Sequence, residues 1–442
     1  MNETKSLRFV DLFAGIGGFH LALRRLGHNC VFASEIDKKL RDRYEENFGM
    51  YGDAVQGDIT NIDLETIPSH DILCAGFPCQ PFSKAGSQLG LKDLVQGTLF
   101  QSIIEVLEKR HPEYLILENV GNFSRHDNGN TWKIVKENLE QLGYDIVASE
   151  PKTSNGIGLI SPHHYGFPHQ RERFYILGTK HKIPVALRDF LSKKPEIKDA
   201  DDYVTLSSLI QETLSDGDKE ETALNKVHEK SINHWNKLLQ NIPRDKHIPS
   251  PIWGDEIDAY YPYNEKVPSD LSKKEAILLG IDMDKLPSYA KRMGPFPRWK
   301  QKYIENSRKW FNDIKPYIPE GWVEGLKEFH QSLRKLEWHC DNSNTSKNKE
   351  RDIWDHIIQV RSSGLRVRPY DRIPALVAFT STQIPILGPH RRHITRQEGL
   401  LFQGFDKDHV LPKSRTESFR ALGNAVHVGV VGKLAEKLLH NG

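Results

Sequence analysis

The sequence predicts an α/β fold with a mostly parallel sheet between residue 7 and about residue 180. Two patterns support this prediction: apolar runs of strand length recur through the region, and helical patterns such as Phe19–Leu26 and Leu99–Leu107 lie between several of them. The runs are Leu7–Phe13, Cys30–Ser34, Ile72–Ala75, Tyr114–Leu117, Tyr144–Ala148 and Phe174–Leu177. Alternation of strands and helices is typical of βαβ units, which form parallel sheets.

The composition indicates a soluble protein with room for two domains. The chain has 442 residues, of which 38% are hydrophobic and 27% charged. No apolar run approaches the length of a membrane span, and the first apolar run starts too early to leave room for a signal peptide. The four cysteines, Cys30, Cys74, Cys79 and Cys340, show no paired CxxC spacing. We therefore expect a cytoplasmic protein without a metal site, a disulfide framework or a membrane segment.

The character of the chain changes after about residue 182. Residues 196–222 are rich in Asp, Glu and Lys and are expected to form a linker or surface excursion, while residues 225–345 are expected to be mostly helical or irregular. Residues 340–350 have the composition of a mobile loop, and Val426–Leu439 is amphipathic enough to form a closing helix.

Basic residues cluster in this second region. Lys291–Lys300 interleaves cations with aromatic residues, and Arg361, Arg366, Arg368 and Arg372 form a second group. Such clusters suit contacts with phosphate groups, although each one is also compatible with an ordinary solvated face.

Two chemically distinctive residues follow apolar runs. Cys79 lies in the segment Gly76-Phe77-Pro78-Cys79-Gln80-Pro81-Phe82-Ser83, and Glu118 opens the segment Glu118-Asn119-Val120. Ligands of parallel sheets gather at the carboxyl ends of the strands, where both residues are expected. A cysteine nucleophile and an acid at these positions can attack and protonate one heterocycle together.

A glycine-rich loop follows the first run. Phe13-Ala14-Gly15-Ile16-Gly17-Gly18 allows a tight turn and close approach of the backbone to a ligand, and the following helix N-terminus favours negative charge. Glu35 ends the second run and can hold ribose hydroxyls. Asp58-Ile59 can supply an acceptor for an adenine amino group and an apolar face for its ring, or Asp58 can be a turn residue. The loop alone leaves NAD, a nucleotide and S-adenosylmethionine open.

Six segments in order resemble the motifs of the bacterial DNA (cytosine-5)-methyltransferases. They are the glycine loop, Pro78–Ser83, Glu118–Val120, Gln170–Tyr175, Ile394–Phe405 and Gly423–Val426. His169 stands where that family often has Gln. Each motif is weak alone, but their order brackets nearly the whole chain and leaves only about residues 182–360 outside.

The resemblance implies a Rossmann-like S-adenosylmethionine-dependent methyltransferase domain joined to a smaller, variable target-recognition domain. The first would comprise residues 1–185 and 415–442, and the second, with the returning connection, residues 186–414. The cofactor, released as S-adenosylhomocysteine, would contact Phe13, Gly15, Gly17, Gly18, Glu35, Ile36, Asp58, Ile59, Pro78, Leu99 and Asn424. For Asn424, a plain helix N-cap is the alternative interpretation.

The resemblance also implies a catalytic mechanism. Cys79 would add to C6 of a cytosine rotated out of the duplex, and Glu118 would protonate or hydrogen bond N3. Arg173 would hold the base at O2, with Arg171 assisting, although Arg173 could instead merely pair with Glu172. Residues 83–98 would form a loop that closes over the base.

The implied substrate is double-stranded DNA. Gln80, Ser83, Arg366 and Arg368 are the expected DNA contacts. We expect a monomer that protects DNA in a bacterial restriction–modification system, with the cognate restriction endonuclease as its genetic partner.

Three rival functions are compatible with parts of the sequence. An RNA cytosine methyltransferase would share the loop motifs, but the long segment outside the motifs favours DNA. A non-catalytic DNA-binding member would be expected to lack Cys79 or Glu118. A nicotinamide-dependent enzyme would leave both residues unexplained.

Overall fold

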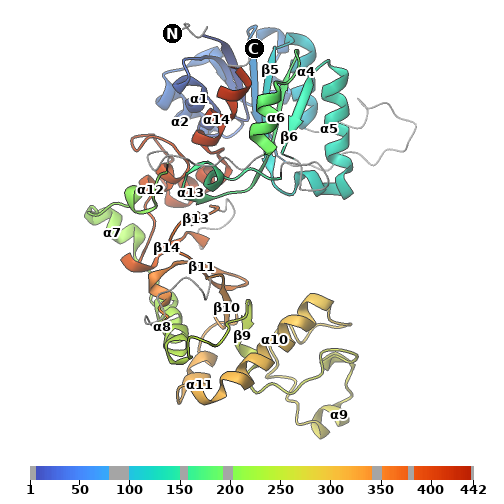
Figure 1. The fold of residues 1–442 in the computed structure, drawn as a ribbon, viewed down its shortest axis with the longest axis vertical. Helices are drawn as coiled ribbons and strands as arrows, with labels where there is room; N and C mark the ends of the chain where they lie inside the picture. The colour runs from blue at the N-terminus through green and yellow to red at the C-terminus, as the bar shows by residue number, and fades with distance from the viewer. Residues whose placement is uncertain are drawn as a thin grey trace. The chain divides into compact units, whose positions relative to one another are not determined.

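The structure is a computed structural model that describes residues 6–78, 99–149, 158–192, 203–340, 351–376 and 383–439. The chain forms two compact units (Figure 1). The first comprises residues 1–213, 371–381 and 395–442, and the second residues 214–370 and 382–394. Residues 186–213, 371–381 and 395–414 thus belong to the first unit, whereas the predicted division placed them in the second domain. That the first unit binds the cofactor and the second recognises the target DNA stays a prediction.

The first unit is built on a seven-stranded sheet with the order β3-β2-β1-β4-β5-β8-β6. Its strands are β1 (Arg8–Leu12), β2 (Asn29–Ser34), β3 (Val55–Gln56), β4 (Ile72–Gly76), β5 (Tyr114–Val120), β6 (Asp145–Ala148) and β8 (Arg173–Thr179). The pairs from β3 to β5 are parallel, and β8 is antiparallel to both of its neighbours. The predicted α/β fold with a mostly parallel sheet is confirmed.

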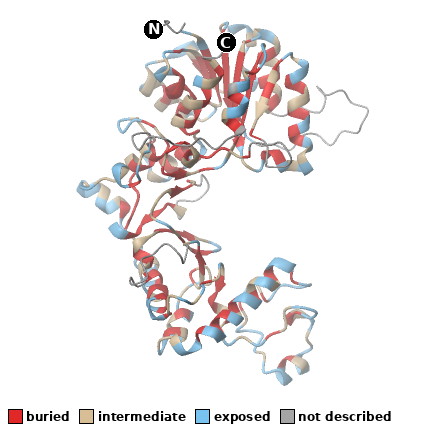
Figure 2. Cartoon of the chain, in the orientation of Figure 1, coloured by how far each residue is buried: buried red, intermediate tan, exposed pale blue. Residues whose placement is uncertain are grey.

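The helices of the first unit are α1 (Gly18–Arg25), α2 (Lys38–Phe48), α4 (Leu99–Arg110), α5 (Asn130–Gln141), α6 (Val185–Ser192), α12 (Arg396–Phe402), α13 (Arg415–Asn424) and α14 (Val428–Leu439). Ile103 of α4 and Val135 of α5 share one buried cluster with Leu73 and Leu115 of the strands. Helix α1 contacts α14, which also contacts α6. Figure 2 shows the strands as the most continuously buried part of this unit.

Local sequence signals set the helix ends. Helix α2 begins after Asp37, whose carboxylate accepts a hydrogen bond from the Lys39 amide at 2.9 Å. It ends at Gly49, which has a left-handed backbone (φ +65°) that suits glycine. Helix α12 begins with a capping box, in which Thr395 and Glu398 each accept a hydrogen bond from the amide of the other.

The second unit contains a six-stranded sheet with the order β15-β14-β11-β12-β10-β9. The strands are β9 (Ile252–Trp253), β10 (Lys335–Trp338), β11 (Ile357–Arg361), β12 (Gly364–Arg368), β14 (Ile386–Leu387) and β15 (Arg392–His393). The helices are α7 (Asp216–Thr222), α8 (Lys226–Asn241), α9 (Lys273–Leu278), α10 (Arg298–Ile314) and α11 (Trp322–Lys327). Trp235, Trp310 and Trp322 lie in its core. This sheet was not predicted from the sequence.

A small parallel pair, β7 (His169–Gln170) with β13 (Ile373–Pro374), completes the strands of the first unit. Most predicted strands differ from the observed ones by one residue at one or both ends. The exceptions are β8, which continues two residues further to Thr179, and β5, which continues three residues further to Val120. Helix α14 begins at Val428 rather than Val426.

We expect Gly17→Ala to destabilise the fold more than Gly27→Ala. Both glycines have positive φ, +82° and +86°. A Cβ at Gly17 would lie 2.2 Å from Cε2 of Phe48, whose ring stacks on His20 at 3.7 Å, whereas a Cβ at Gly27 would meet nothing within 4 Å. Urea unfolding should show a loss of about 2–4 kcal/mol for Gly17→Ala and about 1–2 kcal/mol for Gly27→Ala. Equal losses of unfolding free energy in the two variants would contradict the conclusion that the Phe48 ring excludes a side chain at Gly17.

Candidate active site

The Glu118 carboxyl lies where the ends of two parallel strands meet. Gly76, the last residue of β4, pairs in register with Glu118 on β5. A Cβ at Gly76 would come within 3.7 Å of Glu118 Oε2, so glycine leaves space in front of the carboxyl. Glu118 itself is only 6% exposed.

The segment that follows β4 is tied to β5 by Asn119. The Asn119 amide Nδ2 donates a hydrogen bond of 2.9 Å to the carbonyl oxygen of Phe77. Pro78, which comes next, is exposed. Cys79 follows directly in the sequence and lies outside the described residues, as do Gln80 and Ser83. Asn119 thus positions the start of the predicted catalytic loop. Its place in the motif Glu118–Val120 did not indicate this role.

The surroundings of the Glu118 carboxyl raise its pKa. Burial raises the pKa of Glu118 above its ordinary value, and the guanidinium groups of Arg173 and Arg171 oppose this shift. Arg173 Nε lies 3.0 Å from Glu118 Oε1 in an ion pair, while its Nη1 donates to the Glu172 carbonyl oxygen. The net upward direction means that the carboxyl holds its proton to a higher pH than a solvated glutamate.

The Arg171 side chain binds the backbone of the C-terminal motif, Gly423–Val426. Its Nη2 donates hydrogen bonds to the carbonyl oxygens of Gly423 at 2.9 Å and Ala425 at 2.8 Å. The side chain is buried, which lowers the pKa of Arg171 to about 9. These contacts are those of a positioning residue, and the predicted catalytic assistance by Arg171 stays a prediction.

The segment from Gly423 to Val426 packs against both loops of the site. A Cβ at Gly18 would lie 2.6 Å from Val426 Cγ2, and one at Gly76 would lie 3.8 Å from Val426 Cγ1. Asn424 is exposed and is the last residue of α13, so the N-cap interpretation of Asn424 is wrong. Val426 therefore links the last motif to the glycine loop and to the end of β4, a role that the sequence analysis did not assign.

The residues of the glycine loop have different structural requirements. Phe13 and Gly15 have left-handed backbones, with φ of +56° and +57°. A Cβ at Gly15 would meet nothing within 4 Å, whereas Gly17 and Gly18 are held close by Phe48 and Val426. Of the three glycines, only Gly15 therefore borders open space, where a ligand can approach the backbone.

Glu35 organises the same loop from the end of β2. Its Oε2 accepts a hydrogen bond from the Gly15 amide and its Oε1 one from the Asp37 amide, both at 2.8 Å. Burial raises the pKa of Glu35, and these two backbone bonds oppose that shift. Each carboxylate oxygen has a second lone pair, so the group can still accept hydrogen bonds from hydroxyls. The neighbouring Ile36 is 69% exposed and offers apolar surface beside them.

The other predicted cofactor residues are held mainly by local contacts. Asp58 accepts hydrogen bonds from the amide and hydroxyl of Thr60, at 3.0 and 2.8 Å, as expected of a turn residue. Ile59 is 4% exposed and belongs to the main core, and Leu99 is the half-buried first residue of α4. Their contacts with a cofactor stay predictions.

The two predicted DNA-contacting arginines of the second unit lie on β12. Leu365 and Val367 point into the core, so Arg366 and Arg368 share the opposite, half-buried face. Arg366 Nε lies 2.5 Å from Glu337 Oε2 on the neighbouring strand β10. Within the described ranges, there is no cluster of three His, Cys, Asp or Glu side chains that could hold a metal, and no helix long and apolar enough to cross a membrane.

Comparison with known proteins decides the family. A sequence model described as C-5 cytosine-specific DNA methylase matches residues 7–440. The chain belongs to this family. The predicted membership is thereby confirmed, and with it the methyl donor of the family, S-adenosylmethionine.

Bacterial relatives are similar to different portions of the chain. The Type II methyltransferase M.HhaI of Haemophilus parahaemolyticus is 44% identical over 193 residues, which cover 44% of this chain and 54% of that protein. The shared segment thus spans about half the length of M.HhaI. M.AluI of Cellulosimicrobium cellulans is 29% identical over an alignment covering 96% of this chain and 90% of its own. Among solved structures, a mutant of Spodoptera frugiperda DNMT2 aligns over 98% of this chain and 99% of its own, with 18% identity and a TM-score of 0.48.

We expect Arg171→Met to reduce the stability of the protein more than Arg173→Met. Loss of Arg171 leaves two carbonyl oxygens of the C-terminal motif without their donor, which should lower the free energy of unfolding by about 1–3 kcal/mol. Loss of Arg173 should cost less, because Glu118 can take up a proton in place of the ion pair. Urea unfolding of both variants measures the difference, and an Arg171→Met protein as stable as the unaltered chain would contradict the positioning role.

Proposed function

We propose that the protein is a DNA (cytosine-5)-methyltransferase that methylates a cytosine rotated out of a specific double-stranded sequence, by way of a covalent Cys79–C6 adduct. The main support is the buried carboxyl of Glu118, whose pKa is raised by burial and which lies 3.0 Å from Arg173 Nε. Glu118 is in register with Gly76, which begins the segment that contains Cys79. The bacterial Type II relatives support a role as the modification enzyme of a restriction–modification system.

The glycine loop fits the adenosine part of S-adenosylmethionine. Gly15 borders open space, Glu35 beside it can accept ribose hydroxyls, and Ile36 offers apolar surface for the ring system. Phe13, Asp58, Ile59, Pro78, Leu99 and Asn424 complete the proposed cofactor contacts, while Gly17 and Gly18 keep the loop in shape. When bound, the sulfonium cofactor supplies an electrophilic methyl group.

Glu118 prepares the cytosine for attack. Carbon C5 is a poor nucleophile until the ring becomes enamine-like, and addition of a thiolate to C6 achieves this. A protonated Glu118 donates to N3 and so draws electrons away from C6 as the Cys79 sulfur approaches. Arg173 keeps the carboxyl oriented and contacts O2 of the same base. The raised pKa of Glu118 suits this task, since an ionised carboxylate could not donate.

Cys79 forms and later breaks one bond. Its thiolate adds to C6, the electron pair of the C5–C6 bond becomes available at C5, and C5 accepts the methyl group. A base, which water can provide, then removes the C5 proton. The electron pair of that C–H bond restores the C5–C6 double bond and expels the Cys79 thiolate. The proton shared with N3 returns to Glu118 in the same step, so the enzyme regains its starting state.

Access to C6 requires the cytosine to leave the base stack, at a cost of a few kcal/mol. We propose that Gln80 and Ser83, next to Cys79, contact the DNA around the opened site, and that Arg366 and Arg368 contact DNA from the second unit. We further propose that the enzyme acts as a monomer and that a restriction endonuclease is its genetic rather than physical partner.

Bisulfite sequencing tests the function directly. Plasmid DNA incubated with the purified protein and S-adenosylmethionine should become resistant to conversion at cytosines of one short sequence. Reactions without cofactor, and reactions with transfer RNA in place of DNA, are the controls. Conversion of every cytosine in the DNA, or modification of the RNA alone, would contradict the proposed function.

A duplex with 5-fluorocytosine at the methylated position should trap the enzyme. Fluorine cannot leave C5 as the proton does, so the bond from Cys79 to C6 persists and a protein–DNA adduct should survive denaturation on a gel. Cys79→Ser should form no adduct and should methylate no DNA, while it still binds duplex and cofactor. Cys74→Ser is the matched control, because Cys74 is fully buried on β4 and should not be required for the adduct.

A further inference from the structure

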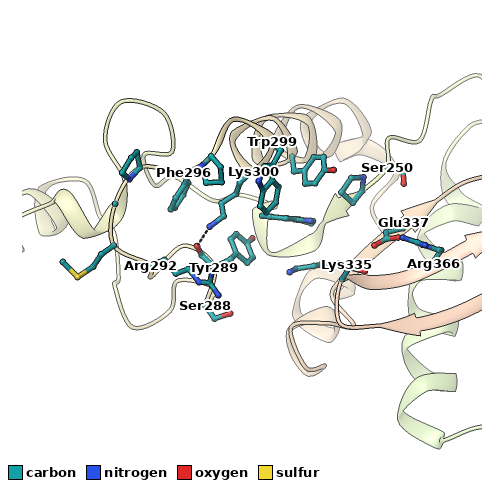
Figure 3. Close-up of a pocket in the computed structure, with 18 of the residues that line it drawn as sticks. Ser250, Ser288, Tyr289, Arg292, Phe296, Trp299, Lys300, Lys335, Glu337 and Arg366 are labelled. Atoms are coloured by element: carbon teal, nitrogen blue, oxygen red, sulfur yellow. Dashed lines mark hydrogen bonds and ion pairs between the residues drawn. The ribbon is translucent and has the colours of Figure 1, made fainter. Parts of the chain in front are cut away.

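A cavity of about 820 Å³ lies within the second unit, in the size range of ligand pockets. It lies between the segment 288–297, the first turns of α10, and strands β9, β10 and β12. In Figure 3, Arg292 and Phe296 lie towards one end, the Glu337–Arg366 pair lies at the other, and Tyr289 and Lys335 lie between them. The mechanism proposed above uses none of these residues except Arg366.

One part of the cavity wall is aromatic. The rings of Trp253 and Tyr289 lie 4.4 Å apart between centroids, and Trp299 packs edge-on against Tyr303 at 5.6 Å. Trp299 is nevertheless 55% exposed, so much of its ring surface is available to a ligand. An exposed tryptophan at the edge of an aromatic pocket is well suited to stacking on a planar ring.

The aromatic wall is held rigidly from behind. The Tyr289 hydroxyl donates a hydrogen bond of 2.7 Å to Glu256 Oε1, and Arg308 Nε donates to Glu256 Oε2 at 2.9 Å. Glu256 is completely buried. The orientation of the Tyr289 ring is therefore fixed by a buried polar network before any ligand arrives.

Cations outnumber carboxylates in the lining. Arg292, Lys300, Lys335 and Arg366 face one carboxylate, Glu337. Lys300 is already used, since its Nζ donates to the Tyr289 carbonyl oxygen at 2.9 Å. Lys335 Nζ lies 4.8 Å from the ring centroid of Trp253 and 4.9 Å from that of Tyr289, and burial lowers its pKa. An anionic ligand would relieve the cost of holding this ammonium group away from water.

The carboxylate of Glu337 is not available to neutralise the other cations. Burial acts to raise its pKa, but hydrogen bonds from His339, Ser363 and Arg366 hold the pKa of Glu337 down at about 2. Glu337 therefore stays ionised and bound to Arg366. This pair places a donor group and an acceptor group together at one end of the cavity, as the edge of a nucleobase requires.

A planar aromatic wall with excess positive charge selects an anionic ligand that contains a flat heterocycle. An organic cation would be repelled by the cationic lining, and a purely apolar ligand would make no polar contact with Arg292 or Lys335. We propose that this cavity binds one nucleotide, with its base against Trp299 and the neighbouring aromatic side chains and its phosphate on Lys335 and Arg292. The Arg366–Glu337 pair faces the edge of the base.

The bound nucleotide is part of a strand of the DNA substrate, and this assignment rests on the proposed function. A free mononucleotide has the same chemistry and is the other source that an experiment must distinguish.

Photo-crosslinking of the full-length protein tests the location. A short DNA strand that carries 5-iodo-2′-deoxyuridine, used alone and within a duplex, should crosslink on irradiation to peptides that contain Trp299, Tyr303, Tyr289 or Trp253. Mass spectrometry identifies the attachment sites. Crosslinks that fall only on other peptides would overturn the proposal.

Binding measurements by fluorescence anisotropy test the energetics. Trp299→Ala and Lys335→Gln should each weaken binding of the labelled strand by about tenfold or more. The matched controls are Tyr260→Ala and Lys309→Gln, at exposed positions of the same unit that do not line the cavity, and they should bind as the unaltered protein does. Equal affinity of all four variants would overturn the proposal.

Competition separates the two sources of nucleotide. Release of the labelled strand by dGMP or ATP would assign the cavity to free nucleotides, and release by unlabelled DNA alone would assign it to the strand. None of these measurements requires methyl transfer, and Cys79→Ser protein should give the same crosslinks. Crosslinks at the cavity without methylation by bisulfite sequencing would therefore contradict the proposed function but support the nucleotide site. Methylation without crosslinks at the cavity would contradict only the nucleotide site.

Discussion

The burial of the Glu118 carboxyl at the end of β5 is the constraint around which the first unit is organised. An ionised carboxylate is costly to bury without a partner, so the group must either hold a proton or be paired. Glu118 can do either, because Arg173 Nε lies 3.0 Å from its carboxyl and burial raises its pKa. Gly76, in register with Glu118, has no side chain that would contact this acid.

The returning C-terminal segment makes this arrangement rigid. Arg171 binds the carbonyl oxygens of Gly423 and Ala425, and Val426 fills the space beside Gly18 and Gly76. The end of the chain thus joins the glycine loop to the strand that leads to Cys79. Because the proposed catalytic side chain and the proposed cofactor loop follow different strands, this shared packing partner couples their positions.

The first unit could be predicted from the sequence to a large extent, because each strand of its sheet except β3 contains an apolar run. The glycine loop, Cys79 and Glu118 each come directly after or close behind one of these runs. The sheet of the second unit could not, since β9, β14 and β15 have two residues each and are too short to show an alternating pattern. The distinction between Gly15, which borders open space, and Gly17, which is confined by Phe48, is also invisible in a motif. The hydrogen bonds of Arg171 to the backbone of Gly423 and Ala425 could not be predicted either, because any residue type at those two positions has a carbonyl oxygen. The roles of Cys79, Gln80 and Ser83 stay predictions, as these residues lie outside the described part of the chain.

The protonation of Glu118 can be measured directly by ¹³C NMR of protein labelled at the glutamate side-chain carboxyl, with Glu118→Gln to assign the resonance. We expect the titration midpoint of Glu118 to lie above the ordinary glutamate value of about 4.3, and to rise further in Arg173→Met because the opposing guanidinium is removed. A midpoint at or below the ordinary value would show that the carboxyl is ionised in the site and would contradict its role as a proton donor.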